Sequence, residues 1–475
     1  MTGRRTAAIF DLDRTIVPTS STRVFQRHMV EAGLSSSTGG PIAELLLKWF
    51  DLAGENGLMM RAARFAPRSA RGWDVAATEA AAEKAAVDLA DEVLPYARQL
   101  LDEHRAAGRA TVLATTSPDH LVRPLAERLG FDDVVATRWE QADGRFTGEL
   151  ASRLVWRRGK LDSVREWAAD HDIDLGSAWA YSDSWFDAAL LAAVGHPTAV
   201  NPDPRMVGLA LLRGWPIRWF DTPPGVVKVA GLELQDLTRP FARPELIPNA
   251  RIEISGVERI PAVGPAIVVG NHRSYFDPMV MTTLIARAGR NARYLGKREV
   301  FDIPLVGAVA RAAGGIRVDR ASGSSEPLET AAAALRAGDV VMIMPQGTIP
   351  RGPAFFDPEL KGRWGAAKLA ALSGAPVIPV GLWGTEQVWP RNARVPRLVL
   401  DDQPLVTATV GDPVELGHED LDADTTAIMT AISALLPPES RERREPTAEE
   451  LAATYPPGYR GDPTQETDRR PGTDT

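Results

Sequence analysis

Two side chains near the middle of the sequence have the spacing of a catalytic base and the group that orients it. His272 follows the apolar run 266–269, and Asp277 lies shortly after it. A strand that ends in a histidine can bring such an imidazole and carboxylate into hydrogen-bonding reach, which activates a hydroxyl for acyl transfer. Asp277 precedes Pro278, so it equally fits an N-cap with proline at the first helical position. The two interpretations are compatible, because a capping carboxylate is also a rigid one.

A second group of polar residues begins near the N-terminus. Asp11 and Asp13 follow the apolar run 7–10 in the turn DLDRT, and α/β folds place their ligands after such strands. One carboxylate can attack phosphorus as a nucleophile while the other serves as general acid and then base. Acidic turns are common, so the signal comes from companions in order along the chain: Thr115, Lys160, Asp183 and Asp187.

Each companion suits one part of phosphate chemistry. Thr115 ends the apolar run TVLATTS and could bond a phosphoryl oxygen, and Lys160 opens a helical pattern and could neutralise charge during transfer. Asp183 and Asp187 offer the oxygen ligands that Mg²⁺ prefers. The alternatives are an N-cap for Asp183 and a solvated surface lysine for Lys160.

The surrounding pattern predicts an α/β fold. Residues 6–16 indicate a buried strand, and residues 20–105 carry apolar residues at helical spacing. Strand and helix patterns then alternate through residue 184, which favours a Rossmann-like parallel sheet with a helical cap. A Pro-rich stretch follows, and then a second α/β unit with the strands AIVVG, DVVMIM and PVIPVGL.

We therefore expect four segments. They are a phosphohydrolase-like domain (1–222, helical cap 18–108), a linker with an amphipathic helix (223–249), a second α/β domain (250–436) and a disordered tail (437–475), which is charged and Pro-rich.

Composition excludes several classes. The 475 residues include no cysteine, so no disulfide, thiolate nucleophile or Cys-ligated zinc is available. A formal charge of −8 argues against nucleic-acid binding. We find no signal-peptide pattern and no apolar run long enough to suggest a simple transmembrane helix.

The first set of motifs resembles the haloacid dehalogenase superfamily, in its phosphoserine-phosphatase-like branch (subclass IB), over about residues 6–215. The resemblance implies that Asp11 is the nucleophile, Asp13 the acid and base, and Thr115 with Lys160 the phosphate anchors. The Mg²⁺ ligands it implies are Asp11, Asp13, Asp183 and Asp187. Thr115 stands where serine is usual, and the hydroxyl is kept.

The second set resembles the glycerolipid acyltransferases of the 1-acylglycerol-3-phosphate acyltransferase (PlsC-like) family, over about residues 250–420. It implies acyl transfer from acyl-CoA or acyl carrier protein to a lysophospholipid hydroxyl. His272 would be the base and Asp277 its orienter. Implied acceptor-binding residues are Arg320, Gln346, Gly347, Thr348 and Arg351.

The third motif departs from that family's pattern. It usually has Glu-Gly-Thr-Arg, whereas this chain has glutamine at position 346 and Ile349 in place of the arginine. Arg351 is a candidate substitute for the lost guanidinium. Arg320 suits bidentate phosphate binding, while the alternative for Arg317 and Arg320 is a solvated strand edge.

Acyl chains are insoluble, so this enzyme must reach a bilayer. The candidate contacts are the stretch 225–246 and the apolar segment 301–314, although core packing is the favoured role for the second. Basic residues beside the second domain suit an anionic surface: Lys228, Arg239, Arg243 and Arg251.

The leading hypothesis is a bifunctional, cytoplasmic enzyme of phospholipid metabolism, attached peripherally to the inner face of the membrane. It joins an Mg²⁺-dependent phosphatase to an acyltransferase. One alternative is an acyltransferase with an idle or regulatory N-terminal domain. Another is a phosphatase whose second half binds lipid without turning it over.

Overall fold

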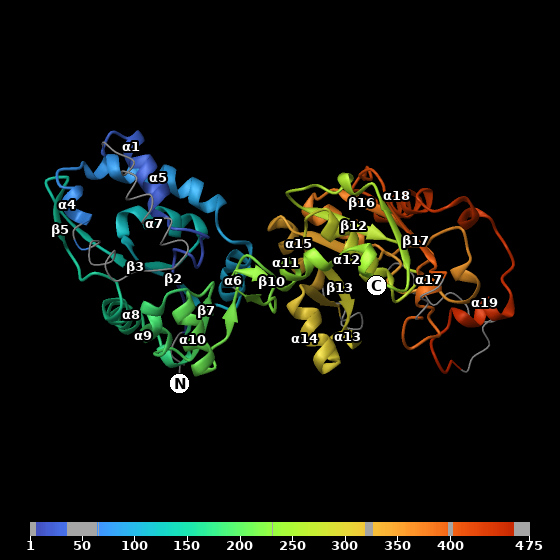
Figure 1. Cartoon of the computed structure of the whole chain (residues 1–475). Coiled ribbons are helices and arrows are strands. Elements are labelled where there is room, and N and C mark those ends of the chain that lie inside the picture. Colours follow the sequence, from blue (N-terminus) through green and yellow to red (C-terminus); the bar gives the residue numbers. More distant parts are fainter. Residues whose placement is uncertain are drawn as a thin grey trace. The chain divides into compact units, whose positions relative to one another are not determined.

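The protein folds into two compact units, residues Met1–Asp221 and Thr222–Thr475. The computed structural model describes residues 6–35, 64, 66–229, 231–318, 326–397 and 402–459. Figure 1 shows the first unit in blue to green and the second in green to red.

A six-stranded parallel sheet forms the centre of the first unit, as predicted. Its strands in spatial order are β3 (Asp133–Thr137), β2 (Ala110–Pro118), β1 (Ala7–Phe10), β6 (Trp179–Ser182), β7 (His196–Val200) and β8 (Ile217–Arg218). All four residues of β1 are buried. A central strand buried on both faces explains its continuous apolar run.

Helices surround this sheet. They are α6 (Pro95–Ala106), α7 (Asp119–Leu129), α8 (Arg158–Asp170), α9 (Ala188–Leu191) and α10 (Pro204–Arg213). α7 ends at Gly130, which has a φ of 78°. Glycine adopts that left-handed conformation without the steric cost that a Cβ would impose.

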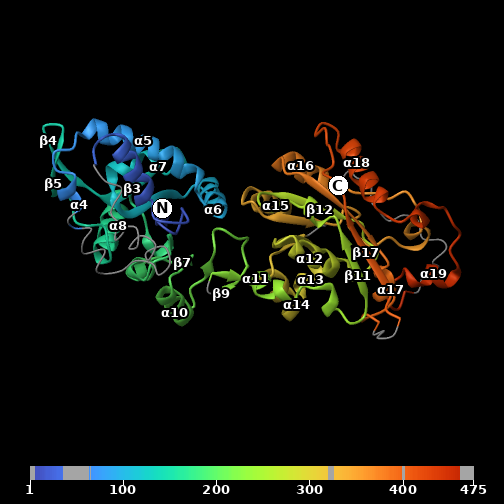
Figure 2. The same ribbon diagram turned by 45° about the horizontal axis from the view of Figure 1, so that its top comes forward.

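The cap combines helices with a hairpin. Its described helices are α1 (Thr22–Glu31), α4 (Ala66–Ser69) and α5 (Val75–Asp91), and α5 packs along α7 (Figure 2). The expected helical cap omitted the antiparallel pair β4 (Trp139–Ala142) and β5 (Arg145–Leu150), which packs on α4. Part of the predicted helical stretch 20–105, residues 36–63 and 65, lies outside the described residues.

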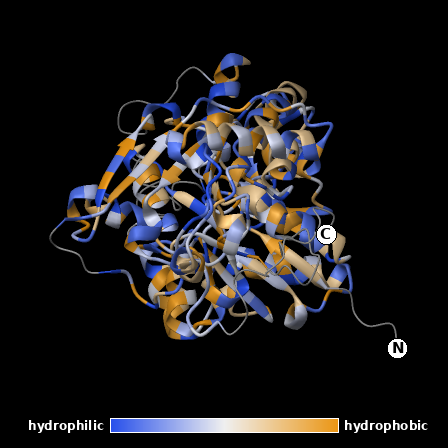
Figure 3. Cartoon of the chain, turned by 90° about the vertical axis from the view of Figure 1, so that its right-hand side faces the viewer, coloured by the Kyte–Doolittle hydropathy of each residue, from blue (hydrophilic) through white to orange (hydrophobic). Residues whose placement is uncertain are grey.

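The second unit contains a seven-stranded sheet in which all pairings except β16–β17 are parallel. Its strands in spatial order are β11 (Arg251–Ser255), β17 (Leu405–Val410), β16 (Val377–Trp383), β12 (Ala266–Gly270), β15 (Val340–Ile343), β13 (Ala292–Lys297) and β14 (Gly315–Val318). Alternate residues of β12 enter two different cores: Val268 packs in one and Ile267 in the other. Apolar segments appear orange in Figure 3.

The described helices of this unit from residue 250 onward are α12 (Asp277–Arg287), α13 (Arg298–Asp302), α14 (Pro304–Ala312), α15 (Glu326–Arg336), α16 (Gly365–Ser373), α17 (Thr385–Val388), α18 (Leu421–Ala434) and α19 (Ala448–Ala453). The short 3-10 turns among the described residues of both units are Leu175–Ser177, Trp185–Asp187, Arg239–Phe241, Pro244–Leu246, Val257–Arg259, Gly352–Phe355 and Pro438–Arg441.

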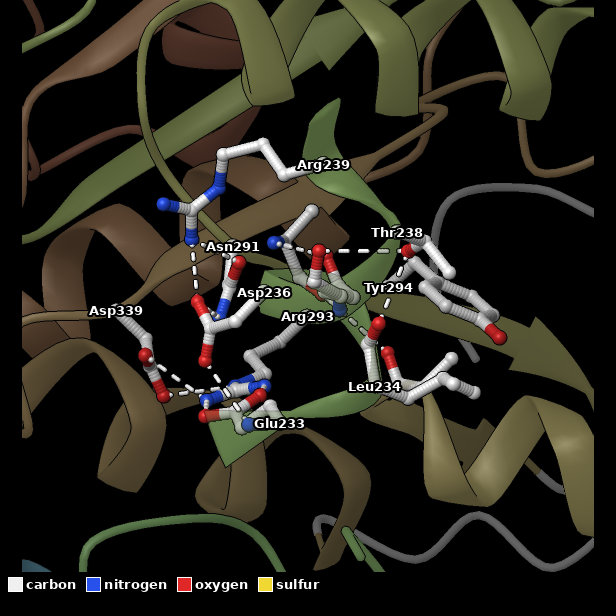
Figure 4. Close-up of polar contacts among 12 residues, drawn as sticks. Glu233, Leu234, Asp236, Thr238, Arg239, Asn291, Arg293, Tyr294 and Asp339 are labelled. Carbon is white, nitrogen blue, oxygen red and sulfur yellow. Dashed lines mark hydrogen bonds and ion pairs between the residues drawn. The ribbon is translucent and has the colours of Figure 1, made fainter. Parts of the chain in front are cut away.

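The segment predicted as a linker with an amphipathic helix is instead built from short elements. β9 (Lys228–Val229) and β10 (Leu232–Glu233) form a hairpin that leads into α11 (Leu234–Thr238). Figure 4 shows how it is held: both oxygens of Glu233 accept hydrogen bonds from Arg293 at 2.5 and 2.7 Å. Asp339 pairs with the same guanidinium at 2.8 Å. This connector is therefore part of the second unit.

The predicted disordered tail is wrong for residues 437–459. Tyr455 is 2 % exposed, and α19 lies beside the turn at Gly352, whose N–H donates to Thr454 Oγ1 at 2.8 Å. The few large apolar residues of this segment are enough to dock it. Residues 460–475 lie outside the described residues.

Candidate active sites

The first candidate site lies where β1 and β6 end. Asp11 and Asp13 follow β1, and Asp183 follows β6, which pairs with β1 in parallel. Carboxyl ends of adjacent parallel strands meet at one edge of the sheet. The two loops are tied together because the Asp183 N–H donates to Thr15 Oγ1 at 3.1 Å.

Lys160 joins two of the carboxylates. Its Nζ lies 2.7 Å from Asp11 Oδ1 and 2.5 Å from Asp187 Oδ2, and its side chain is 3 % exposed. Ser182 Oγ also donates to Asp187 Oδ2 at 2.7 Å. The solvated-lysine alternative is therefore wrong. The structure also gives Asp187 a role in holding Lys160 that sequence reasoning missed, since the two are far apart along the chain.

The charges of this cluster are unevenly matched. Burial raises the pKa of Asp11 to about 7; the Lys160 ammonium opposes this shift, while the Asp187 and Asp13 carboxylates add to it. Burial alone would lower the pKa of Lys160, but Asp11 and Asp187 raise it, so the ammonium stays protonated. Lys160 thus pairs with two carboxylates, and the negative charge that it leaves unmatched favours a further cation.

Arg14 contacts one of the predicted metal ligands. Its Nε lies 3.1 Å from Asp183 Oδ2, and its backbone has a φ of 60°. Among the residues that the structure describes, no three His, Asp or Glu side chains are arranged so that they could together hold a metal ion. The N-cap alternative for Asp183 is wrong, because Ser184 caps the following turn and accepts from Phe186 N–H.

The oxygen donors of this edge fit Mg²⁺ chemically. Asp11, Asp13 and Asp183 carry carboxylates, which are the hard oxygen donors that this ion prefers. Asp13 Oδ1 accepts from Ser21 N–H at 2.7 Å, which fixes that carboxyl group. Thr115 lies on β2, which neighbours β1, and is 2 % exposed.

The second candidate site is the predicted histidine and aspartate pair. His272 Nδ1 lies 2.7 Å from Asp277 Oδ2. The same oxygen accepts from the backbone N–H groups of Arg273 at 2.6 Å and Ser274 at 2.7 Å. Asp277 is fully buried, whereas the His272 side chain is 18 % exposed. The buried Asp277 carboxylate thus orients the His272 imidazole, and part of the ring stays accessible to solvent.

Asp277 does not cap its helix. It is the first residue of α12, Phe276 occupies the N-cap position, and no side chain caps the helix there. The Asp277 carboxylate instead holds the loop that precedes the helix. The N-cap alternative is therefore wrong, while the contact with His272 is present.

Gln346 also positions the histidine loop. Its Oε1 accepts from the His272 backbone N–H at 2.6 Å, and the residue is 3 % exposed. Asn271 ties the other side of the loop to β16, where it donates to Leu382 O at 2.9 Å and accepts from Leu382 N–H at 2.7 Å. Sequence reasoning placed Gln346 among the acceptor-binding residues and missed this structural contact.

Arg273 was also overlooked, although it stands next to the histidine. It pairs with Glu386 through Nε at 3.0 Å and an η nitrogen at 2.8 Å. Its guanidinium lies 4.2 Å from the Trp383 ring centre and 4.4 Å from that of Phe355. A bidentate pair stacked on aromatic rings holds the loop rigidly.

Three further predicted residues, Gly347, Thr348 and Arg351, lie in the segment that follows β15. Gly347 has a φ of 70°, and Thr348 and Arg351 are partly buried. Ile349 is 3 % exposed, and its carbonyl accepts a hydrogen bond from Arg391. Arg320 lies outside the described residues.

Arg317 lies on the edge strand β14 and pairs with Asp302 at 3.2 Å with 45 % of its side chain exposed. The strand-edge alternative is thus confirmed for Arg317.

Comparisons with known proteins match a different family to each unit. Residues 8–192 match the haloacid dehalogenase-like hydrolase family, and residues 251–383 match the acyltransferase family. The inhibition of morphological differentiation protein of Streptomyces azureus is 38 % identical over 223 residues, which are 46 % of this chain and 80 % of that protein. Phosphoserine phosphatase SerB1 of Mycobacterium tuberculosis is 35 % identical over 222 residues, 45 % of this chain and 70 % of that one.

One solved structure of an acyltransferase is similar to part of this chain. The 1-acyl-sn-glycerophosphate acyltransferase PlsC of Thermotoga maritima is 20 % identical with a TM-score of 0.33, over 42 % of this chain and 78 % of that one. The chain belongs to the haloacid dehalogenase-like hydrolases through its first unit. It is a fusion of such a hydrolase with an acyltransferase domain.

Proposed function

We propose that the second unit transfers an acyl group from acyl-CoA or acyl carrier protein to 1-acylglycerol-3-phosphate or a related lysophospholipid. The contact of 2.7 Å between His272 Nδ1 and Asp277 Oδ2 carries this proposal. With Nδ1–H donating to the carboxylate, Nε2 is free to accept the proton of the acceptor hydroxyl. The hydroxyl oxygen then attacks the thioester carbonyl, the C–S bond breaks, and the leaving thiolate takes the proton from His272 Nε2.

The first unit would hydrolyse a phosphomonoester through an aspartyl-phosphate. Asp11 attacks the phosphorus, and Asp13 gives a proton to the leaving oxygen and later takes one from water. Lys160 keeps Asp11 in place and offers positive charge to the phosphoryl group. Mg²⁺, when held by Asp11, Asp13 and Asp183, would supply further charge neutralisation.

Two variants test the two activities separately. Asp11→Asn should abolish phosphate release and leave acyl transfer within about threefold, a barrier change below about 1 kcal/mol. His272→Ala should do the reverse. If Asp11→Asn left phosphate release intact, Asp11 would not be the nucleophile. Absence of phosphate release from the wild type would favour the idle or regulatory module of the alternative hypothesis. Loss of both activities in folded Asp11→Asn would mean one coupled catalytic unit.

An exposed apolar surface suits contact with a bilayer. On α14 and the residue before it, Ile303, Leu305, Val306 and Val309 are 52, 78, 47 and 53 % exposed. The expected core-packing role of this segment is wrong for these four residues. No helix in the described ranges is both long and apolar enough to span a membrane.

The connector lies beside this helix and extends the surface. Gln235 Nε2 donates to Ala313 O, just after α14, at 2.5 Å. The connector exposes further apolar side chains: Val227, Val229, Leu232, Leu234 and Leu237. Apolar area of this kind, flanked by basic residues, supports peripheral attachment of the enzyme to an anionic leaflet at the inner face of the membrane.

Liposome pelleting tests this attachment. Leu305→Ser with Val309→Ser should weaken binding and acyl transfer on vesicles, while phosphatase activity on a soluble substrate stays unchanged. Leu372→Ser is the matched control, because Leu372 is 59 % exposed on α16. Equal pelleting of the double variant and the wild type would refute this surface.

The basic charges need a separate variant. Arg239 is bound to Asp236 at 2.5 Å, so reversing its charge would disturb the connector itself. Lys228→Glu with Arg243→Glu avoids that contact. This pair should weaken binding to anionic vesicles, with each charge near the surface contributing about 1 kcal/mol, and leave binding to neutral ones unchanged.

A further inference from the structure

The first unit contains a pocket away from the carboxylate cluster, with a volume of about 610 Å³. It opens at the amino-terminal ends of β6 and β7, where Trp179 and His196 line it. Asp183 follows the opposite end of β6, so at a rise of about 3.3 Å per residue it lies about 13 Å from Trp179 along the strand. The pocket is therefore distinct from the site of phosphate chemistry.

Two arginines give the pocket its charge. Arg109 and Arg218 line it, and neither has an ion-pair partner within 4.0 Å among the described residues. Glu103 is the carboxylate in the lining, and it is exposed. Burial, with the charges of the two arginines, lowers the pKa of His104 to about 4, so this histidine is neutral at pH 7. The lining as a whole carries excess positive charge.

A chain of hydrogen bonds fixes the donors at the pocket floor. An η nitrogen of Arg109 donates to His104 Nδ1 at 3.1 Å. His104 Nε2 must then carry the hydrogen, and it donates to the Tyr181 hydroxyl oxygen at 2.8 Å. The Tyr181 hydroxyl hydrogen is left as a donor, since its oxygen already accepts. Arg109 and Tyr181, at the two ends of this series of hydrogen bonds, can therefore both donate to a ligand that accepts hydrogen bonds.

Aromatic rings make up another part of the wall. Trp179 stacks on His196 with ring centres 4.3 Å apart and planes at 14°, and the Arg109 guanidinium lies 3.9 Å from the Trp179 ring centre. His196 is exposed, and Trp215 also lines the pocket. Flat rings beside cations favour a planar ligand that stacks as well as pairs.

We propose that this pocket binds a small anion joined to a planar ring, of the chemistry of a nucleoside monophosphate. The phosphate would pair with Arg109 and Arg218, and the ring would lie against His196 and Trp215. The volume is in the range of about 300–1,000 Å³ that holds small ligands. The proposal concerns a binding site, independent of both proposed activities.

Calorimetric titration of the full chain with AMP tests the proposal, with EDTA present to prevent hydrolysis. Wild type should bind AMP saturably, and at least tenfold more tightly than either adenosine or inorganic phosphate. Arg218→Gln should weaken AMP binding at least tenfold, and so should Arg109→Gln. Arg213→Gln is the matched control, since Arg213 is exposed on α10 outside the lining, and it should bind as wild type does.

Any of four results would overturn the proposal. The first is no saturable binding of AMP by wild type at millimolar concentration. The second is equal affinity in wild type and Arg218→Gln. The third is loss of AMP binding in Asp11→Asn, which would place the ligand at the carboxylate cluster. Inorganic phosphate binding as tightly as AMP would also contradict the role given to the rings.

Discussion

Replacing Asp277 by asparagine separates the charge of this residue from its geometry. Asp277 Oδ2 accepts three hydrogen bonds, from His272 Nδ1 at 2.7 Å and from the N–H groups of Arg273 and Ser274 at 2.6 and 2.7 Å. Oδ1 is buried without a hydrogen-bond partner in the described structure. An asparagine should therefore place its carbonyl oxygen at the Oδ2 position. In the flipped orientation its NH₂ group would face the N–H groups of Arg273 and Ser274, which are also donors.

The expected loss follows from the charge alone. Hydrogen bonds to ionised groups contribute about 1–2 kcal/mol more than neutral ones. Asp277→Asn should keep the His272 tautomer and lower kcat of acyl transfer about 5–30-fold, at about 1.4 kcal/mol per decade. The amide NH₂ at the Oδ1 position would be buried and unpaired, so the free energy of unfolding should fall by about 1–3 kcal/mol.

Release of the CoA thiol is a suitable assay. The chain has no cysteine, so a thiol reagent detects product alone. Asp424→Asn is the matched control, because Asp424 is 4 % exposed and also accepts two backbone N–H bonds, from Gly417 and His418. It should lose stability without losing kcat. A kcat within twofold of wild type in folded Asp277→Asn would refute the claim that this carboxylate assists the histidine.

Further predictions concern metal, pH and the altered motif. EDTA should stop phosphate release and leave acyl transfer unchanged, and Mg²⁺ should restore the former; EDTA-sensitive acyl transfer would contradict the histidine mechanism. Between pH 3.8, the ordinary pKa of an aspartate, and about pH 7, the pKa of folded Asp11, the folded protein holds a proton that the unfolded chain has lost. In EDTA, the unfolding temperature of the first unit should therefore fall as the pH rises through this range. Saturating Mg²⁺ should flatten that slope, as differential calorimetry would record. Ile349→Arg and Gln346→Glu both bury a charge, because both residues are 3 % exposed. Only the glutamate keeps an oxygen for the His272 N–H, so Ile349→Arg should cost at least about 3 kcal/mol of stability and more than Gln346→Glu does. Equal denaturant midpoints for the two variants would contradict this argument.

The sequence by itself determined which residue types stand at the ends of which strands. The runs before Asp11 and His272 are continuous and apolar because β1 and β12 are buried on both faces, and that pattern is local. The end of α7 at Gly130 could also be predicted from the residues next to it, because a glycine after a helical pattern is a local signal. Fold class and the main catalytic candidates could be predicted for this reason.

Other features depend on residues far apart along the chain. Lys160 and Asp11 are 149 positions apart, and Gln346 and His272 are 74 apart. No spacing rule connects such pairs, so the lysine was open to a surface interpretation, and the glutamine to a substrate role. The pocket around His104 likewise draws on α6, β6 and β7 at once.

Exposure was also decided by the tertiary structure. Leu305 and Tyr455 illustrate opposite outcomes. Leu305 lies in an apolar segment that was predicted to pack in the core, yet it is 78 % exposed. Tyr455 lies in a charged tail that was predicted to be disordered, yet it is only 2 % exposed. Composition measures how much apolar surface a segment has, and the neighbouring elements determine whether that surface is covered. The exposed surface on α14 and the docked end of the chain are therefore properties of the folded second unit, which the order of its residues did not reveal.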